Sequence, residues 1–249
     1  MRALVAQLRA ELTMVFTNGE TVLLTVGIPV VFLVFFATVH VLPIGTRHPL
    51  DFLVPGIVAL SVMSTSMTAL GIGAGFERGY GVLKRLGTTP LGRPRLLAAK
   101  ILSVLAIEIA QVIVVVLVGL ALGWHPGTGG SGGAHGIETG PAVAAVVLGS
   151  IGFGGIALLL AGVLKPLVNL AVANGLFVVL LLLGGMLLPL TKFPTWLADV
   201  ARLLPASALA DGLEHALGAH TPVTGTDWIV LAVWAVAAPI AAAATFRWE

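Results

Sequence analysis

Long apolar runs follow one another along the chain, separated by shorter polar connections. Each run is long enough to cross a hydrocarbon core of about 30 Å as an α-helix, which takes about 20 residues. Helices are expected because lipid cannot satisfy backbone N–H and C=O groups, and β-barrel strands would alternate apolar and polar residues. The sequence therefore predicts an all-α, polytopic membrane protein with six transmembrane helices, at residues 21–42, 52–76, 96–122, 141–164, 167–190 and 226–246.

The composition agrees with this interpretation. Of the 249 residues, 58% are hydrophobic and only 10% are charged, and the mean hydropathy is +1.07. A soluble domain usually carries about 25% charged residues. The absence of cysteine excludes disulfides, thiol nucleophiles and thiolate metal sites. A single transmembrane domain over residues 1–249 is the expected organisation.

The segment before the first run, residues 1–18, is amphipathic. Its apolar residues fall within an arc of about 120° on a helical wheel, and they are Leu4, Val5, Leu8, Leu12, Val15 and Phe16. Polar residues such as Arg2, Arg9 and Glu11 occupy the rest of the circumference. A helix of this kind lies in the membrane interface with its basic residues toward water and headgroups. We therefore predict an interfacial helix over residues 1–18.

Lysine and arginine are distributed unevenly over the connections. Six spans place both termini, the 77–95 connection and residue 165 on one side of the membrane. That side holds ten basic residues: Arg2, Arg9, Arg78, Lys84, Arg85, Arg93, Arg95, Lys100, Lys165 and Arg247. The other side holds three, Arg47, Lys192 and Arg202. Because basic residues concentrate in cytoplasmic loops, we expect both termini to be cytoplasmic.

Residues 191–217 are apolar, but prolines interrupt them and the segment is too short to cross the membrane twice. The residues of interest in this segment are Phe193, Pro194, Trp196, Leu197 and Pro205. Tryptophan favours the headgroup region, and irregular backbone at membrane depth needs protein or water around it. We predict a re-entrant or interfacial helical hairpin near the outer surface, and an ordinary amphipathic loop is the alternative.

The densest charge lies between the second and third runs, over residues 77–92. One side of a short predicted helix carries an apolar ridge of Val82, Leu83 and Leu86. Lys84 and Arg85 lie off this ridge, and the helix ends before Pro90. Such a helix can dock in a groove on a soluble partner; the alternative is a basic loop that only fixes the topology.

Two motifs resemble ABC transporter permeases of the type-2 exporter family, a group that includes drug exporters and polysaccharide or teichoic-acid exporters. The first, Glu77-Arg78-x-x-Gly81-x-Leu83-Lys84-x-Leu86-x-x-Thr89-Pro90, looks like the family's cytoplasmic loop. The second, Phe193-Pro194-x-Trp196-Leu197 with a later Leu204-Pro205, is similar to the family's outer hairpin. Together with the interfacial helix and the six spans, the resemblance covers nearly the whole chain.

The resemblance implies that residues 77–92 hold a coupling helix, which docks on a separate ABC ATPase subunit and converts its closure into movement of the spans. The residues implied in docking are Glu77, Arg78, Gly81, Val82, Leu83, Lys84, Leu86, Thr89 and Pro90. One departure is Val82, because the family often has threonine after the glycine. The resemblance also implies two ATPase copies, a second permease chain (identical or related) around a central pathway, and a bacterial cell (inner) membrane.

ATP chemistry is expected on the partner rather than on this chain. The sequence has no Walker A pattern, and no Gly-Lys-Ser/Thr follows the glycine-rich stretch at residues 127–133. It also lacks catalytic motifs such as His-Glu-x-x-His and Gly-x-Ser-x-Gly. The evidence for a metal site is weak, and it consists of Glu214, His215 and His220. We expect no cofactor in this chain, ATP and Mg²⁺ on the ATPase, and no nucleic-acid partner.

Polar residues inside the runs are few. Those of the second run stand at i, i+3, i+4 and i+7 and form one stripe of Ser61, Ser64, Thr65 and Thr68. They line a substrate path in one interpretation, and bond to backbone carbonyls or a neighbouring helix in the other. Asn169 and Asn174 in the fifth run are expected to bond between helices. The glycines of the fourth and fifth runs are expected to allow close helix packing.

Glu108 lies near the middle of the third run, one turn before Gln111. A carboxylate at this depth costs several kcal/mol unless it is protonated, paired or exposed to water. Glu108 and Gln111 are therefore candidates for the pathway or the dimer interface. The alternative is a protonated glutamic acid that bonds to a neighbouring helix.

These features predict the membrane-spanning permease subunit of an ATP-driven exporter for a hydrophobic or amphipathic substrate, such as a drug, a lipid or a lipid-linked glycan. A secondary transporter is one alternative, but it would need a coupling-ion site of several intramembrane charges or inverted repeats. A structural membrane subunit that transports nothing is another. An ATPase gene beside the permease gene would favour the exporter.

Overall fold

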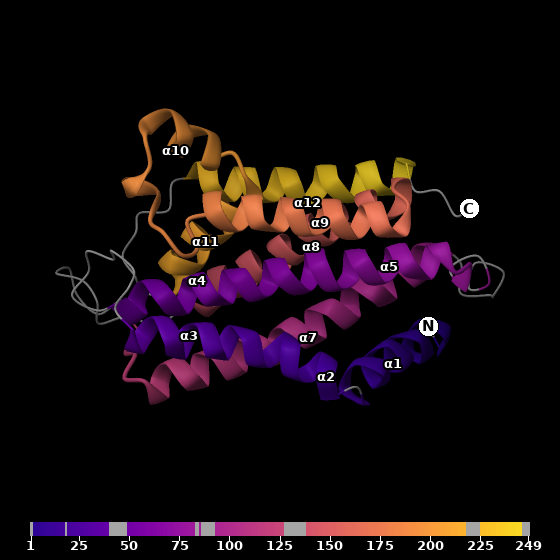
Figure 1. Ribbon diagram of the computed structural model, residues 1–249, viewed down its shortest axis with the longest axis horizontal. Helices are drawn as coiled ribbons and strands as arrows, with labels where there is room; N and C mark the ends of the chain where they lie inside the picture. The colour runs from indigo at the N-terminus through magenta and orange to yellow at the C-terminus, as the bar shows by residue number, and fades with distance from the viewer. Residues whose placement is uncertain are drawn as a thin grey trace.

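The structure, a computed structural model, describes residues 2–17, 19–39, 49–82, 85, 93–126, 138–217 and 225–245. In these ranges all regular structure is helical, which confirms the all-α prediction. Figure 1 shows long helices that run side by side in one elongated bundle.

Within the described residues, five continuous helices are long and apolar enough to cross a membrane. The first consists of α4 (Pro49–Met63), a π-helical turn η2 (Ser64–Ala69) and α5 (Leu70–Gly79). The others are α7 (Arg93–Ala121), α8 (Thr139–Val163), α9 (Pro166–Leu183) and α12 (Gly225–Thr245). Each overlaps a predicted span, so the multi-pass membrane prediction is confirmed at this level.

The span predicted at residues 21–42 is built differently. It consists of α2 (Gly19–Val22), a π-helical turn η1 (Leu23–Gly27) and α3 (Ile28–Thr38). Its apolar helix, Thr25–Thr38, is shorter than the five others. Residues 40–42 of the prediction lie outside the described part of the chain. The six-span arrangement as a whole therefore stays a prediction.

The fifth span ends earlier than residue 190, where the sequence placed its end. Helix α9 stops at Leu183 because Gly184 leaves the helix and Gly185 adopts a left-handed φ of +71°. Glycine takes this conformation without steric cost, and it is a common helix terminator. Apolar residues continue after the helix ends, which is why hydropathy alone misplaced the boundary.

Residues 190–217 form a 3₁₀ turn η3 (Leu190–Lys192) and two short helices, α10 (Thr195–Ala201) and α11 (Pro205–Ala216). Helix α11 is mostly buried and packs against α4, α8 and α12. Helix α10 is more exposed, and Trp196 stands on its surface. Figure 1 shows α10 and α11 at the end of the bundle opposite to α1. This pair of helices is compatible with the predicted hairpin.

Helix α1 (Arg2–Thr17) lies beside α7, near the end of the bundle where α5 ends (Figure 1). At the centre, α8 packs along α12 and also contacts α5 and α11. Glycines allow this close approach, as predicted: a Cβ atom on Gly155 would lie 2.6 Å from the backbone nitrogen of Pro239 in α12. The fold thus places α8 at the core and leaves one end of α5 free to continue into residues 80–92.

Candidate functional site

The predicted docking segment begins in the last turn of α5, which contains Glu77 and Arg78. The chain then turns at Gly81, whose φ of +71° lies in the left-handed region that favours glycine. Val82 and Arg85 follow with exposed side chains. The remaining predicted docking residues, Leu83, Lys84, Leu86, Thr89 and Pro90, lie outside the described part of the chain.

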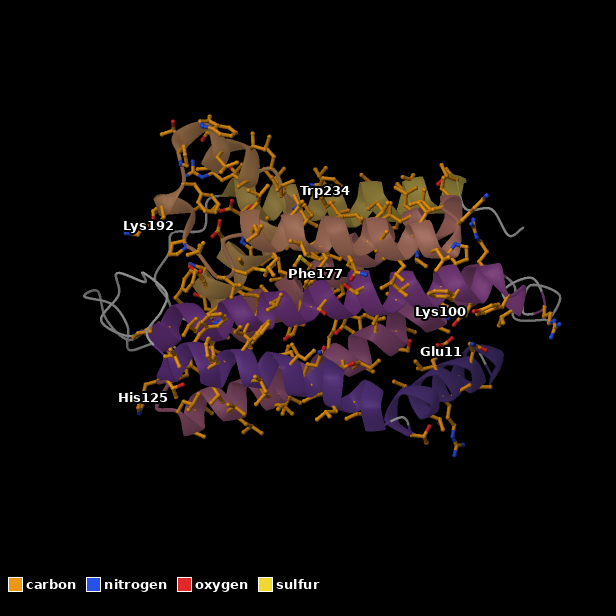
Figure 2. All side chains as sticks on the ribbon, in the orientation of Figure 1. Glu11, Lys100, His125, Phe177, Lys192 and Trp234 are labelled. Atoms are coloured by element: carbon orange, nitrogen blue, oxygen red, sulfur yellow. The ribbon has the colours of Figure 1, made fainter. Side chains whose placement is uncertain are left out.

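Glu77 belongs to a partly buried cluster of charges, centred on Lys100, that the sequence did not predict. The Lys100 ammonium on α7 is 4% exposed and lies 2.7 Å from Glu77 Oε2 and 3.0 Å from Glu11 Oε1 on α1. Gln7 donates a hydrogen bond of 2.9 Å to the same Glu11 oxygen. Figure 2 shows Glu11 and Lys100 pointing toward each other between α1 and α7. Because a buried ammonium is costly without partners, this cluster ties α1, α5 and α7 together.

Arg78, the next residue of α5, makes a second anchor, to the end of α8. Its guanidinium donates hydrogen bonds to the carbonyl oxygens of Gly162 and Leu164, the latter at 2.5 Å. These carbonyls lie at the C-terminal end of α8, where a cation satisfies unpaired oxygens and complements the helix dipole. The side chains of Glu77 and Arg78, which the sequence assigned to ATPase docking, thus contact helices of the permease itself.

Small residues bring α5 close to its other neighbours. Gly71, Gly75 and Gly79 stand one turn apart on one face of α5. Added Cβ atoms at these positions would lie 2.9 Å from Ala157, 2.5 Å from Asn169 and 2.4 Å from Pro166, respectively. Asn169 Nδ2 donates to the Gly71 carbonyl at 2.8 Å, so Asn169 bonds between helices as expected. The end of α5 is therefore held on both sides.

The polar stripe on the second span faces into the bundle. Ser61 Oγ donates to the Ile57 carbonyl of its own helix at 2.7 Å. Thr65 Oγ1 donates to Gln111 Oε1 on α7 at 2.8 Å. Thr68 Oγ1 is buried and has no hydrogen-bond partner among the described residues. For Ser61 and Thr65 these contacts favour the packing interpretation over a substrate path within one chain; Ser64 is half-buried.

Glu108 is fully buried between three helices. Its Oε1 accepts a hydrogen bond of 2.5 Å from Ser66 in η2, and its Oε2 is hydrogen-bonded to Ser150 Oγ on α8. Ser150 Oγ also lies 2.7 Å from the Val146 carbonyl, yet a serine has a single hydroxyl proton. Both Ser150 contacts are hydrogen bonds only if the Glu108 carboxyl carries a proton and donates it to Ser150. The geometry therefore favours a neutral glutamic acid that joins α7, η2 and α8.

Replacing Glu108 with glutamine should leave the protein almost unchanged. The Gln amide can donate to Ser150 and accept from Ser66, as the neutral acid does, so we expect stability within about 1 kcal/mol of wild type. Glu108→Ala should cost about 2–3 kcal/mol, because it opens a cavity and removes the interhelical bonds. Thermal unfolding in detergent and ATP hydrolysis by the permease–ATPase complex measure both variants. A Gln variant with normal stability but lost coupling to ATP hydrolysis would show instead that the charge itself is needed.

A second group of acids lies at the other end of the bundle, on α11. Burial raises the pKa of Glu214 to about 8, with a further contribution from the charge of Asp211. Burial also raises the pKa of Asp211 to about 6, and Asp227 on α12 adds to that shift. Because the pKa values of Asp211 and Glu214 are raised, the two acids are expected to be protonated more readily than ordinary surface carboxyls.

Among the described residues there is no group of three His, Cys, Asp or Glu side chains that could hold a metal ion.

Glu214→Gln should stabilise the protein at alkaline pH. The folded-state pKa of Glu214 lies above its ordinary value of 4.5, so its favourable contribution is complete below that value and is lost as the pH rises through about 8. The glutamine variant cannot ionise here, so its melting temperature should exceed that of wild type near pH 9 and approach it near pH 4. Exposed Glu138→Gln is the control. Parallel pH curves for Glu214→Gln and wild type would contradict this assignment.

The sequence gives only weak indications of several of these contacts. Lys100 is a lone basic residue at the start of an apolar run, and Glu11 sits among the polar residues of an amphipathic helix. Lys100 and Glu11 are each typical of ordinary interfacial residues, and no sequence periodicity indicates that they lie close together. Ser66 and Ser150 are single hydroxyls in apolar runs. Only the three-dimensional packing brings these groups together.

The described residues form a multi-pass helical bundle, which defines an integral membrane protein. The sequence profile of the ABC-2 type transporter family matches residues 2–217, so the chain belongs to that family and is a membrane permease domain. Members of the family associate with ABC ATPases. No curated protein matches the chain.

Proposed function

We propose that the chain is the permease subunit of an ATP-driven exporter and that residues 77–92 dock on a separate ABC ATPase. The observation that supports this proposal is the anchoring of α5 immediately before the exposed residues Val82 and Arg85. Lys100 pairs with Glu77 and also with Glu11 on α1, and Arg78 bonds to the end of α8. A force applied to residues 80–92 therefore acts at once on α1, α5, α7 and α8.

The proposed orientation places this end of the bundle in the cytoplasm. Helix α1 begins there and α12 ends there (Figure 1), and most basic residues fall in the connections on that side. Helices α10 and α11 at the opposite end would then form the outer hairpin. Its buried helix α11 contacts α4, α8 and α12, so it is positioned to shape an exit.

The proposed pathway forms between two permease chains, and α9 is the best candidate for its wall. This helix is the least buried of the five long spans. Its exposed face carries Ala171, Asn174 and Gly175, and the space around Gly175 is open. Asn174 bonds only to the Leu170 carbonyl of its own helix among the described residues, unlike the interhelical bond that was expected. An amide and small residues at membrane depth suit a helix partner or an aqueous path better than lipid.

The substrate class that fits is hydrophobic or amphipathic: a drug, a lipid or a lipid-linked glycan. A secondary transporter is less well supported, because Glu108 is enclosed by hydrogen-bond partners rather than open to a path. The two ATPase copies of the proposed complex would supply ATP and Mg²⁺ binding.

Co-purification tests the proposal. The tagged permease should retain an ABC ATPase encoded beside it, and the complex in liposomes should hydrolyse ATP at a rate different from that of the free ATPase. In the same preparation, an Asn174→Cys chain should form a disulfide-linked dimer under mild oxidation, since the wild-type chain has no cysteine. Cysteine at Val143, exposed on α8, is the control. A permease that binds no ATPase would refute the exporter assignment.

A further inference from the structure

The described part of the chain contains two π-helical turns, η1 in the first span and η2 in the second. A π turn is wider than an α turn and is rare, and it frequently marks a functional site within a helix. It is also one of the few identifiable causes of helix bending. Neither turn contains proline, but Pro29 in the first turn of α3 has no N–H to donate to the Thr25 carbonyl in η1. No proline lies within one turn of η2, so side-chain contacts are the candidates for what stabilises η2.

One turn of α7 contacts both π-helical turns. The Gln111 amide accepts the hydrogen bond from Thr65 in η2, and its Nε2 donates to the Thr25 carbonyl in η1 at 2.7 Å. Glu108, one turn earlier, accepts from Ser66 in η2. The two wide turns, η1 at Leu23–Gly27 and η2 at Ser64–Ala69, are thus bridged by a single buried glutamine. This arrangement is specific, because each hydrogen-bonding atom of the Gln111 side chain has its own partner.

The packing partners of the second span change at η2. Before it, α4 packs mainly against α3, α7 and α11. After it, α5 packs against α8 and α9. The π turn therefore lies at the boundary between two groups of helices, and α5 leads directly into the segment that we propose docks on the ATPase.

Thr68 gives independent evidence that η2 has a second arrangement. In α-helical parts of the chain, buried hydroxyls bond to a carbonyl one turn earlier, as Ser61 does to Ile57, Ser150 to Val146 and Ser103 to Lys100. Thr68 lies inside the π turn, and its buried hydroxyl has no partner among the described residues. In an α-helical turn the same hydroxyl would reach the Ser64 carbonyl. The π arrangement thus leaves unsatisfied a group that the α arrangement would satisfy.

We propose that η2 is the flexure of the second span and that Gln111 and Thr65 are the positioning residues that hold it in the π arrangement. Tightening of η2 toward an α-helical turn re-orients α5 relative to α4 and satisfies Thr68 at the expense of the Thr65–Gln111 bond. Interhelical hydrogen bonds of this kind are individually weak in membranes, so the exchange is accessible. This inference rests on the proposed function, because the docked ATPase would supply the force that changes η2.

The double variant Thr65→Val with Gln111→Leu tests the positioning role. Both replacements keep the side-chain size roughly constant, and the Thr65 donor and its Gln111 acceptor are removed together, so that only the Thr25 carbonyl loses a donor. We expect the complex to assemble, but the effect of the permease on the ATP hydrolysis rate should fall roughly tenfold, since two interhelical bonds are lost. Thr65→Ser keeps the hydroxyl and should behave like wild type. Ser61→Ala removes a hydroxyl that is hydrogen-bonded within its own helix, and it should also behave like wild type.

Hydrogen exchange on the wild-type complex is the second measurement, and it does not depend on a variant that folds. Amides of residues 64–69 should change protection by about tenfold between the nucleotide-free and ATP-bound complexes, whereas amides of residues 53–60 should not. Unchanged protection at residues 64–69 in a complex that hydrolyses ATP would overturn the flexure. A double variant that assembles and retains wild-type regulation of hydrolysis would overturn the positioning role. Failure of the wild-type permease to bind an ATPase would instead refute the proposed function.

Discussion

A Lys100→Met permease should lose about 2 kcal/mol of stability and should regulate its ATPase poorly, because removing the buried ammonium leaves two partly exposed carboxylates without their counter-ion. Lys100 is the only cation that the structure places beside Glu11 and Glu77 among the described residues. Without it, two carboxylates from α1 and α5 face each other at the base of the docking segment. Thermal unfolding of the purified permease and ATP hydrolysis by its complex measure the two effects.

Two comparisons separate this effect from a simple change of charge. Lys165→Met removes an exposed lysine on the same side of the membrane and should change stability by less than about 0.5 kcal/mol. The triple variant with Lys100→Met, Glu11→Gln and Glu77→Gln removes the whole cluster and should recover much of the lost stability. If Lys100→Met were as stable as Lys165→Met, the cluster would not be the anchor of α5.

The second large effect is expected at Gly155, where α8 meets α12. An added Cβ atom would lie 2.6 Å from both the nitrogen and Cδ of Pro239 and 2.8 Å from the Ala238 carbonyl carbon. Two of these three atoms belong to the backbone, so the contact can be relieved only by moving the helices apart. Gly155→Ala should therefore cost about 2–3 kcal/mol and reduce the yield of monodisperse protein in detergent.

The adjacent glycine provides the control. A Cβ atom on Gly154 would have Leu70 Cδ2 as its nearest neighbour, at an ordinary distance of 3.5 Å. Gly154→Ala should be neutral or slightly stabilising, since alanine favours helix formation more than glycine does. Equal melting temperatures for the two variants would contradict the close packing of α8 on α12.

The sequence predicted the large features of the fold well because they depend on composition and period. Long apolar runs determine the helices, and the overlap of each long helix with a predicted span follows from that. Boundaries set by backbone conformation were harder to predict, as the end of α9 at Leu183 shows. The π turns in the first two spans were also missed, because a π turn needs only one extra residue and leaves the apolar pattern intact.

The contacts of the candidate site residues could not be predicted from the sequence. The resemblance implied a docking role for Glu77 and Arg78, and their side chains bond to α7 and to the end of α8. Glu108 was expected to be either a pathway residue or a bonded neutral acid, and its partners Ser66 and Ser150 favour the second. In both cases the partner comes from a distant part of the sequence, so no local pattern could identify it.

The most direct test of the central proposal is the affinity of the permease for its ABC ATPase after the apolar ridge is charged. The triple variant Val82→Asp, Leu83→Asp and Leu86→Asp should fold normally but bind the ATPase at least about tenfold more weakly, because carboxylates would replace the apolar side chains that enter the partner's groove. Val200→Asp, a charge on exposed α10 at the opposite end, should bind like wild type. Unchanged binding and unchanged regulation of ATP hydrolysis in a well-folded triple variant would show that residues 77–92 are not the docking surface.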